Sequence, residues 1–92
     1  QGLVLDLRNN EIGDIGVDIL LKSFHLLHFE YIKEIHLQNN NITDIGFIKL
    51  CKTLSSLSNV NMPYIERLGI ESNPISGKAK KEFHPIPSFF SF

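Results

Sequence analysis

Few side chains in this sequence have the type and spacing that chemistry requires, and two histidines are the first candidates. His25 and His28 are three residues apart near the end of an expected helix, a spacing that a zinc ion can use. No cysteine or pair of carboxylates accompanies them. Surface or packing roles for both histidines are therefore the simpler interpretation, and we predict no metal and no cofactor.

The other candidate residues also have a structural explanation. Cys51 lies on an apolar stripe and is expected to be a small buried hydrophobic residue rather than a nucleophile. The run KAKK (Lys78–Lys81) fits a solvated helix face, because so short a run is a weak signal for nucleic-acid binding. Asn41–Thr43 reads NIT and matches the N-glycosylation pattern, but no secretory signal is visible. No catalytic triad, phosphate-binding loop or carboxylate pair stands out, so we predict that the protein is not an enzyme.

The composition is that of an ordinary folded domain. Hydrophobic residues make up 42% and charged residues 21% of the 92 positions, and the formal net charge is −1. Because there is no basic excess and no long apolar run, neither nucleic acid nor a membrane is an expected partner. One cysteine excludes an internal disulfide and favours an intracellular compartment: the cytoplasm, or else the nucleus or a cilium. The opening QGLVLDL has no initiator methionine, so we expect a piece of a longer protein.

The strongest pattern in the sequence is an internal repeat. LDLRNNEIGDIG begins at Leu5, and IHLQNNNITDIG begins thirty residues later, at Ile35. Aligning 5–20 with 35–50 gives eight identities in sixteen positions, and a period of this size is typical of a solenoid. A partial third copy follows at a shift of 33, and we place its three extra residues in the loop SNVNMP. We predict one domain with repeats at about 2–31, 32–64 and 65–83 and a C-terminal capping tail at 84–92.

Each copy divides into a strand and a helix. Apolar residues alternate with polar ones before the turn, which predicts strands with a buried face at Leu3, Leu5, Leu7, at Ile35, Leu37, and at Leu68, Ile70. After the turn the apolar spacing is helical, with stripes at Val17, Leu20, Leu21, Phe24, Leu27 and at Phe47, Leu50, Cys51, Leu54, Leu57. Asp14 and Asp44 stand just before these stripes and are expected to cap the helices that begin there. Strands joined by helices in this way are parallel.

This layout resembles the leucine-rich repeat of the ribonuclease-inhibitor-like type, whose pattern runs LxxLxLxxNxIxDxGxxxLxxxL. The pattern is carried by Leu5, Leu7, Asn10, Ile12, Asp14, Gly16 and Leu20, and again by Ile35, Leu37, Asn40, Ile42, Asp44, Gly46 and Leu50. The resemblance covers the chain from Leu3 to Phe83. It implies an α/β fold, a horseshoe segment of a solenoid with a short parallel sheet on its concave face and helices on its convex face. It also implies a function in protein binding.

The repeated asparagines have a structural explanation. The turn after each strand bends with its backbone inside the solenoid, where unpaired amide groups are costly. Asn10, Asn40 and Asn73 each carry a donor and an acceptor, and we expect them to form a ladder that satisfies these turns. Gly16 and Gly46 are expected to let the helices approach the sheet closely.

The third copy departs from the pattern after Ile75. GKAKKEF can form a short helix capped by Ser76, with Phe83 in the position of Leu50, and the prolines of HPIP must end it. The tail PSFFSF is expected to fold over the open end of the solenoid, because terminal repeats are atypical. A loose tail, or one that binds another chain, is the alternative. No such segment precedes Leu3, so we expect that end to be bare or covered by further repeats.

The candidate binding surface follows from the alternation along the strands. Residues between the buried strand positions face out from the concave side, and parallel stacking places Asp6 beside His36 and Glu34 beside Arg67. We predict that a protein partner binds a patch formed by Asp6, Arg8, Glu34, His36, Gln38, Arg67 and Glu71. Charges that only compensate one another in solvent are the alternative interpretation.

Three functions fit this prediction. We favour a protein-interaction module within a larger scaffold or regulator. The second is control of an enzyme or small GTPase, because the same repeat type occurs in ribonuclease inhibitors, in activators of a Ran-type GTPase and in innate immune sensors. The third is a cytoskeletal or ciliary scaffold, as in tropomodulin-like proteins.

Overall fold

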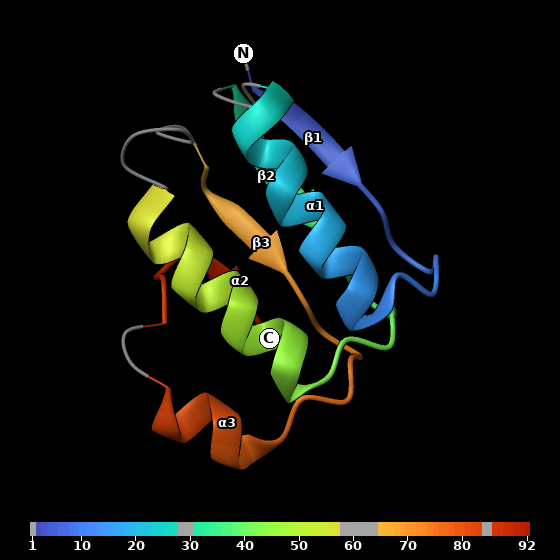
Figure 1. Cartoon of the computed structure of the whole chain (residues 1–92), viewed down its shortest axis with the longest axis vertical. Helices are drawn as coiled ribbons and strands as arrows, with labels where there is room; N and C mark the ends of the chain where they lie inside the picture. Colours follow the sequence, from blue (N-terminus) through green and yellow to red (C-terminus); the bar gives the residue numbers. More distant parts are fainter. Residues whose placement is uncertain (1, 28–30, 58–64, 84–85) are drawn as a thin grey trace.

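Strands and helices alternate along the described part of the chain. The computed structural model describes residues 2–27, 31–57, 65–83 and 86–92, and within 25–27 and 55–57 the backbone alone. The elements are β1 (Leu3–Asp6), α1 (Gly13–Leu27), β2 (Ile32–His36), α2 (Asp44–Leu57), β3 (Arg67–Gly69), α3 (Gly77–Glu82) and β4 (Phe90–Ser91). The strands form one parallel sheet in the order β1-β2-β3-β4, and α1 and α2 lie side by side over one of its faces (Figure 1). The predicted α/β architecture is therefore confirmed. No helix in the described segments is long and apolar enough to cross a membrane.

The core lies between the sheet and the helices. Apolar residues of the second and third strands point into it, and Ile35, Leu37 and Leu68 are completely buried. The helices contribute their predicted stripes, from which the buried members are Val17, Leu21, Phe24, Phe47, Leu50, Cys51 and Leu54. Burying one such aliphatic side chain contributes about 1.5–3 kcal/mol. The predicted stripe positions Leu27 and Leu57 have side chains outside the described residues.

The first strand is less buried than its sequence pattern predicts. Leu3 is 62% exposed, so the prediction that its side chain is buried is wrong. Leu5 and Leu7 are only half-buried, and the register with β2 shifts between Leu3 and Val4. The physical reason is that β1 is an edge strand, because within the described chain nothing stacks against its outer side.

Asparagines connect the turns of successive repeats. Asn40 is completely buried, and its Oδ1 accepts hydrogen bonds from the backbone N–H groups of Asn10 at 2.8 Å and Ile12 at 3.2 Å. Asn73 repeats this geometry one unit later, accepting from the N–H groups of Asn40 at 2.8 Å and Ile42 at 3.0 Å. Each of these side chains therefore reaches back to the turn of the preceding repeat. A buried amide left without such partners costs about 1–3 kcal/mol.

Aspartates connect the repeats in the opposite direction. The Oδ1 atom of Asp14 accepts hydrogen bonds from the N–H groups of Thr43 at 2.9 Å and Gly46 at 3.0 Å, at the start of α2. Asp44 accepts from the N–H of Ser76 at 2.7 Å and from its hydroxyl at 2.8 Å, and these bonds lower the pKa of Asp44. The prediction that each aspartate caps its own helix is therefore wrong, because both reach the next repeat.

The helical glycines make room for these turn contacts. A Cβ atom at Gly46 would collide with the Asp14 carboxylate and come within 2.9 Å of the Ile42 side chain. A Cβ atom at Gly16 would collide with Ile12. The predicted close approach is therefore present, but it involves the turn and the preceding repeat rather than the sheet.

The other two repeated asparagines, Asn9 and Asn39, occupy turn positions with positive φ angles, which the repeat pattern alone does not reveal. Asn9 and Asn39 have φ angles of 63° and 57°, and Ser72 takes the same position in the third repeat with a φ of 61°. Asparagine tolerates this left-handed region better than most residues. The Asn39 side chain also donates to the Asn9 Oδ1 atom at 2.7 Å. The repeated Asn-Asn pair thus combines a left-handed turn residue with a ladder residue.

The third repeat has a short helix, as predicted. The hydroxyl of Ser76 accepts a hydrogen bond from the N–H of Ala79 at 3.0 Å, which makes Ser76 the N-cap of α3. The helix ends at Glu82, and Phe83 is already extended and packs against the core. The predicted loop SNVNMP at 58–63 and the residues 84–85 lie outside the described residues.

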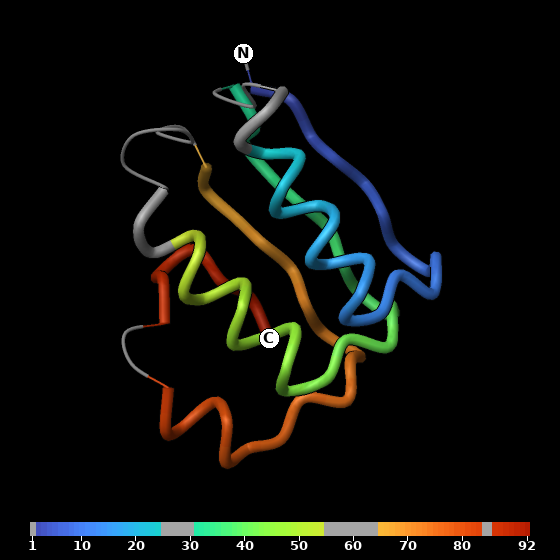
Figure 2. The backbone as a smooth tube through the Cα atoms, in the orientation of Figure 1, coloured from blue at the N-terminus to red at the C-terminus, as the bar shows by residue number. Residues whose placement is uncertain are grey.

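The C-terminal tail forms a fourth strand beside β3 (Figure 2). The N–H of Leu68 donates to the carbonyl oxygen of Phe89 at 2.8 Å, and Leu68 is paired with Phe90 in the strand register. The rings of Phe90 and Phe92 pack edge-on against Phe47, with centroid distances of 6.2 Å and 5.7 Å. The tail therefore extends the sheet and adds aromatic side chains to the core beyond the third repeat.

Candidate binding face

The side of the sheet turned away from the helices is the concave face, and it carries the predicted site residues. Because Ile35 and Leu68 point into the core, their neighbours along the strands face the other way. The register pairs Asp6 with His36 and Glu34 with Arg67, as parallel stacking predicts. Arg8, Gln38 and Glu71 continue the same alternation just beyond the strand ends. The seven residues thus come from three adjacent strands and share one face.

Charges on this face pair along the strands rather than across them. The Arg8 guanidinium donates to both Asp6 carboxylate oxygens, at 2.8 Å and 2.7 Å. These side-chain hydrogen bonds, with a weaker one from the Arg8 backbone, lower the pKa of Asp6 to about 2. The side-chain hydrogen bonds and the charge of Asp6 raise the pKa of Arg8. On the second strand, Glu34 Oε1 lies 2.9 Å from His36 Nε2. Residues two apart on a strand share a face, so cross-strand neighbours compete with partners in the same strand.

Glu71 links the third strand to the fourth on this face. Its Oε2 atom lies 3.5 Å from the Arg67 guanidinium and accepts a hydrogen bond from the Ser91 hydroxyl at 3.2 Å. Ser91 pairs with Gly69 in the register, so it belongs to the concave face although it is absent from the predicted patch. The alternation of apolar and polar residues in Phe90-Ser91-Phe92 is the signal that could have identified it as a strand residue.

The middle of the concave face lies at Gly69, which is the register partner of His36. The Gln38 side chain lies over this glycine, because a Cβ atom there would be 2.9 Å from Gln38 Cδ and 3.0 Å from Glu71 Oε1. Three buried atoms around this point have no hydrogen-bond partner among the described residues: His36 Nδ1, Gln38 Oε1 and Glu71 Oε1. The two side-chain oxygens are acceptors, and His36 Nδ1 is one when Nε2–H donates to Glu34. The centre of the face is therefore suited to a group that donates hydrogen bonds.

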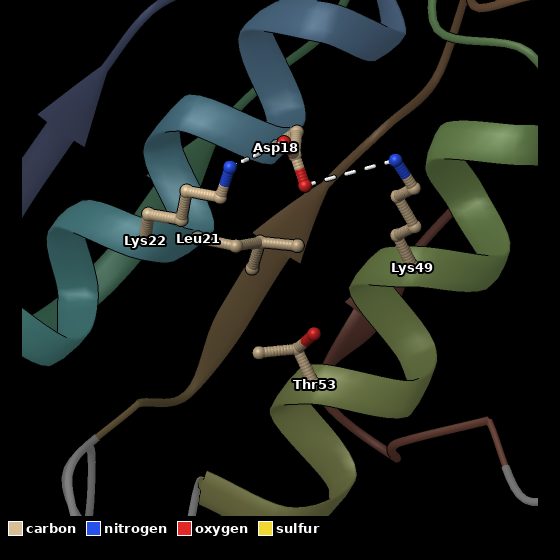
Figure 3. A pocket seen from close by; sticks show the side chains of 5 residues that line it. All are labelled: Asp18, Leu21, Lys22, Lys49 and Thr53. Atoms are coloured by element: carbon tan, nitrogen blue, oxygen red, sulfur yellow. Dashed lines mark ion pairs between the residues drawn. The ribbon is translucent and has the colours of Figure 1, made fainter.

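A hollow lies on the convex side between α1 and α2, with a volume of about 250 Å³ and walls formed by Asp18, Leu21, Lys22, Lys49 and Thr53 (Figure 3). Asp18 holds Lys22 at 3.1 Å and Lys49 at 3.6 Å. The Lys22 hydrogen bond, together with the charges of both lysines, lowers the pKa of Asp18. Asp18 is shared by two lysines, so these ion pairs tie α1 to α2 and leave an excess of positive charge at the hollow.

The remaining candidates from the sequence are Cys51, the lysine run at 78–81, and the histidines His25 and His28. Cys51 is completely buried, as predicted, and its burial raises the pKa of the thiol to about 12. The predicted solvated run is only partly solvated, because Lys80 lies over the Phe92 ring, 5.0 Å from its centroid, and is half-buried. The side chains of His25 and His28 lie outside the described residues. Elsewhere in the described chain, no group of three or more metal-binding side chains gathers.

Comparison with known families finds a repeat in two stretches of the chain. A family model described as "Leucine Rich repeat" matches residues 3–20 and 30–51. The first match spans β1 and the first half of α1, and the second spans β2 and the first half of α2. No curated protein matches the chain. Both matched stretches are the strand–turn–helix units that the asparagine and aspartate contacts join.

Proposed function

Because this chain is a segment of a leucine-rich-repeat solenoid, we propose that it is a non-catalytic module that binds a protein partner through its concave face. Leucine-rich repeats commonly serve as protein–protein interaction modules. The proposed contact residues are Asp6, Arg8, Glu34, His36, Gln38, Arg67 and Glu71, to which the fold adds Ser91. The convex layer of helices supports the ribonuclease-inhibitor-like type, and the buried single cysteine supports an intracellular location.

The observation that carries this proposal is the group of unpaired acceptors at the centre of the face. Arg8 and Asp6 satisfy each other, and so do Arg67 and Glu71 Oε2, which fits the alternative of compensated surface charges. That alternative does not account for buried acceptor atoms without partners on His36, Gln38 and Glu71. Leaving such an atom unpaired costs about 1–3 kcal/mol, so a partner that donates hydrogen bonds there gains affinity.

The size of the face limits how tightly three repeats can bind. Strands in a sheet are about 4.8 Å apart, so four short strands make a narrow surface. A stable interface buries at least about 1,000 Å². We therefore propose that the chain contributes part of a larger surface, and that neighbouring repeats supply the rest.

Charge reversal on the two faces tests this proposal. The double variant Arg8→Glu/Arg67→Glu should weaken partner capture by the full-length protein, because it changes charge at both sides of the concave face. Its thermal midpoint should change little, since exposed ion pairs contribute little to stability. Capture is measured with a partner first identified by crosslinking from photoreactive groups placed at Gln38 and, separately, at Lys52.

The matched control is Lys22→Glu/Lys52→Glu on the convex helices. This variant carries the same change in net charge and also removes an ion pair, the one between Lys22 and Asp18. It should capture the partner as well as the unmodified protein does. If the convex variant loses capture while the concave variant keeps it, the binding surface lies on the helices and the proposal is wrong.

A further inference from the structure

The charges of the concave face balance at its first strand but not at its middle. Asp6 and Arg8 neutralise each other through two hydrogen bonds. On the second strand, Glu34 bonds to His36, and a neutral imidazole cancels no charge. Three carboxylates of the face stand against two guanidinium groups: Asp6, Glu34 and Glu71 against Arg8 and Arg67. With His36 neutral, the face keeps one uncompensated negative charge, on the central strands β2 and β3.

Glu71 has one carboxylate oxygen engaged and the other unpaired. Its Oε2 atom accepts from the Ser91 hydroxyl at 3.2 Å and lies 3.5 Å from the Arg67 guanidinium. Its Oε1 atom is buried and has no hydrogen-bond partner among the described residues, as is also true of Gln38 Oε1 and His36 Nδ1. Hydrogen bonds from a cation to a carboxylate are roughly twice as strong as those between neutral groups. A cation with several N–H groups is therefore the donor that fits these acceptors best.

Gly69 contributes no side chain at the point where these acceptors meet. Its φ is not in the left-handed region, so the backbone does not require glycine there. A Cβ atom would lie 2.9 Å from Gln38 Cδ and 3.0 Å from Glu71 Oε1, so the Gln38 side chain takes the space above Gly69. Because Gln38 lies beyond the end of β2, its side chain can turn outward and give a ligand access to Glu71 Oε1.

We propose that this part of the concave face, the arginine site formed by His36, Gln38, Gly69 and Glu71, binds an arginine side chain of the protein partner. The inference rests on the proposed function and names the group that the face recognises. A guanidinium has five N–H donors and no acceptor, so it matches a group of unpaired acceptors. It is more weakly hydrated than an ammonium group, so arginine loses less than lysine does on entering a partly buried site. The two arginines of the face remain contacts for acidic groups elsewhere on the partner.

Short capped peptides test whether the site recognises arginine. The probe is acetyl-Gly-Arg-Gly-amide, titrated into the 92-residue chain and followed by the NMR shifts of the Gly69 and Glu71 amides. The same peptide with citrulline in place of arginine keeps the shape and loses the charge. We expect a dissociation constant of roughly 1 mM for the arginine peptide, about tenfold weaker binding of the citrulline peptide, and weaker binding of a lysine peptide as well. Equal binding of the arginine and lysine peptides would show attraction to positive charge alone and would overturn the inference.

Two substitutions locate the binding. Glu71→Gln removes the charge and keeps the shape, and it should weaken binding of the arginine peptide about tenfold. Glu66→Gln is the matched control, since Glu66 is exposed and by alternation lies on the opposite side from Arg67. Gly69→Val places a side chain where the guanidinium would lie, and it should remove binding while circular dichroism shows a folded chain. Equal binding of the arginine peptide to Glu71→Gln and to the unmodified chain would refute the arginine site.

The peptide results separate this inference from the proposed function. If the arginine peptide does not bind at Gly69 while charge reversal at Arg8 and Arg67 still weakens partner capture, the inference fails and the proposed function stands. If the arginine peptide binds at Gly69 while capture does not depend on the concave face, the arginine site is supported and the proposed function fails.

Discussion

The two ends of this short solenoid are finished in different ways. At the C-terminal end, β4 pairs with β3, and Phe90 and Phe92 pack against Phe47. At the N-terminal end, no described strand pairs with the outer edge of β1, and Leu3 and Ile19 are more than half exposed. The sequence matches the repeat pattern better at this end, although no described element covers it. Agreement with a repeat pattern therefore predicts the shape of a unit, whereas its burial depends on what stacks against it.

Leucines at equivalent repeat positions show most clearly how much a neighbouring repeat changes the burial of a side chain. Leu37 is completely buried between its neighbours, and Leu7, the same residue at the same repeat position, is half-buried. Leu50 and Leu20 form a second such pair. The chemistry and local structure are the same within each pair, so the difference comes from the neighbouring repeat. Substituting both leucines of a pair therefore measures how much stability a neighbouring repeat adds at that position.

The largest expected effect is on the leucine pairs. Leu37→Ala should destabilise the protein by about 2–5 kcal/mol, and Leu7→Ala by roughly half as much, because the cavity at Leu7 opens to solvent. Urea unfolding followed by circular dichroism measures both. Leu50→Ala and Leu20→Ala should repeat the ordering. Equal losses within both pairs would mean that the N-terminal end is covered in solution.

The next effect concerns the aromatic cover of the C-terminal end. Phe90→Ala should cost about 2–4 kcal/mol, somewhat below the range for a completely buried phenylalanine, because Phe90 is partly exposed. Phe92→Ala is the matched control, and its loss should be smaller since that side chain is 47% exposed. Thermal unfolding of both variants checks the ordering. A tail that contributes nothing would leave both midpoints unchanged.

The asparagine ladder should show a smaller difference between the centre and the open end. Asn40→Ala removes the acceptor for the N–H groups of Asn10 and Ile12, and should cost about 1–3 kcal/mol more than Asn10→Ala. Denaturant titration gives the comparison. Asn41→Gly is the control for the turn, because Asn41 is exposed and has a φ of 58° that glycine adopts freely. Equal losses for Asn40→Ala and Asn10→Ala would contradict a ladder that ends at the first repeat.

The smallest expected effect is the titration of Asp6 at the open end. Its folded pKa of about 2 lies below the ordinary value of 3.8, so its contribution to stability is present above that ordinary value and is lost as the pH falls toward 2. Arg8→Gln should return the Asp6 pKa toward its ordinary value, because Arg8 supplies the main hydrogen bonds. NMR of the Asp6 carboxyl carbon measures its pKa in both proteins. The titration runs from roughly pH 1.5 to pH 6, so that it covers the lowered and the ordinary pKa. Arg67→Gln should leave Asp6 unchanged, and an equal rise in both variants would assign the shift to the general field of the face.

Particular residues show which features of the structure could be predicted from the sequence. The strand–turn–helix order, the parallel strands and the short α3 capped by Ser76 follow from local patterns, and they are correct. The concave-face register also follows, since alternation and a fixed period determine which of Asp6, His36, Glu34 and Arg67 are neighbours. The along-strand pairing of Asp6 with Arg8 was missed, because side-chain conformers choose between neighbours at similar distances. Ser91 was missed because its strand exists only through pairing with β3.

The sequence by itself determined the repeat unit, its turn residues and the face on which each strand residue lies. Those properties depend on backbone preferences and hydrophobic spacing within about thirty residues, so nearby residues in the sequence encode them. Only the tertiary structure decided the forward reach of Asp14 and Asp44, the half-exposure of Leu7 and Leu20, and the strand formed by the tail. Each of these depends on which atoms a neighbouring repeat brings into contact. A repeat can encode its own shape, but its burial and its hydrogen-bond partners belong to the unit beside it.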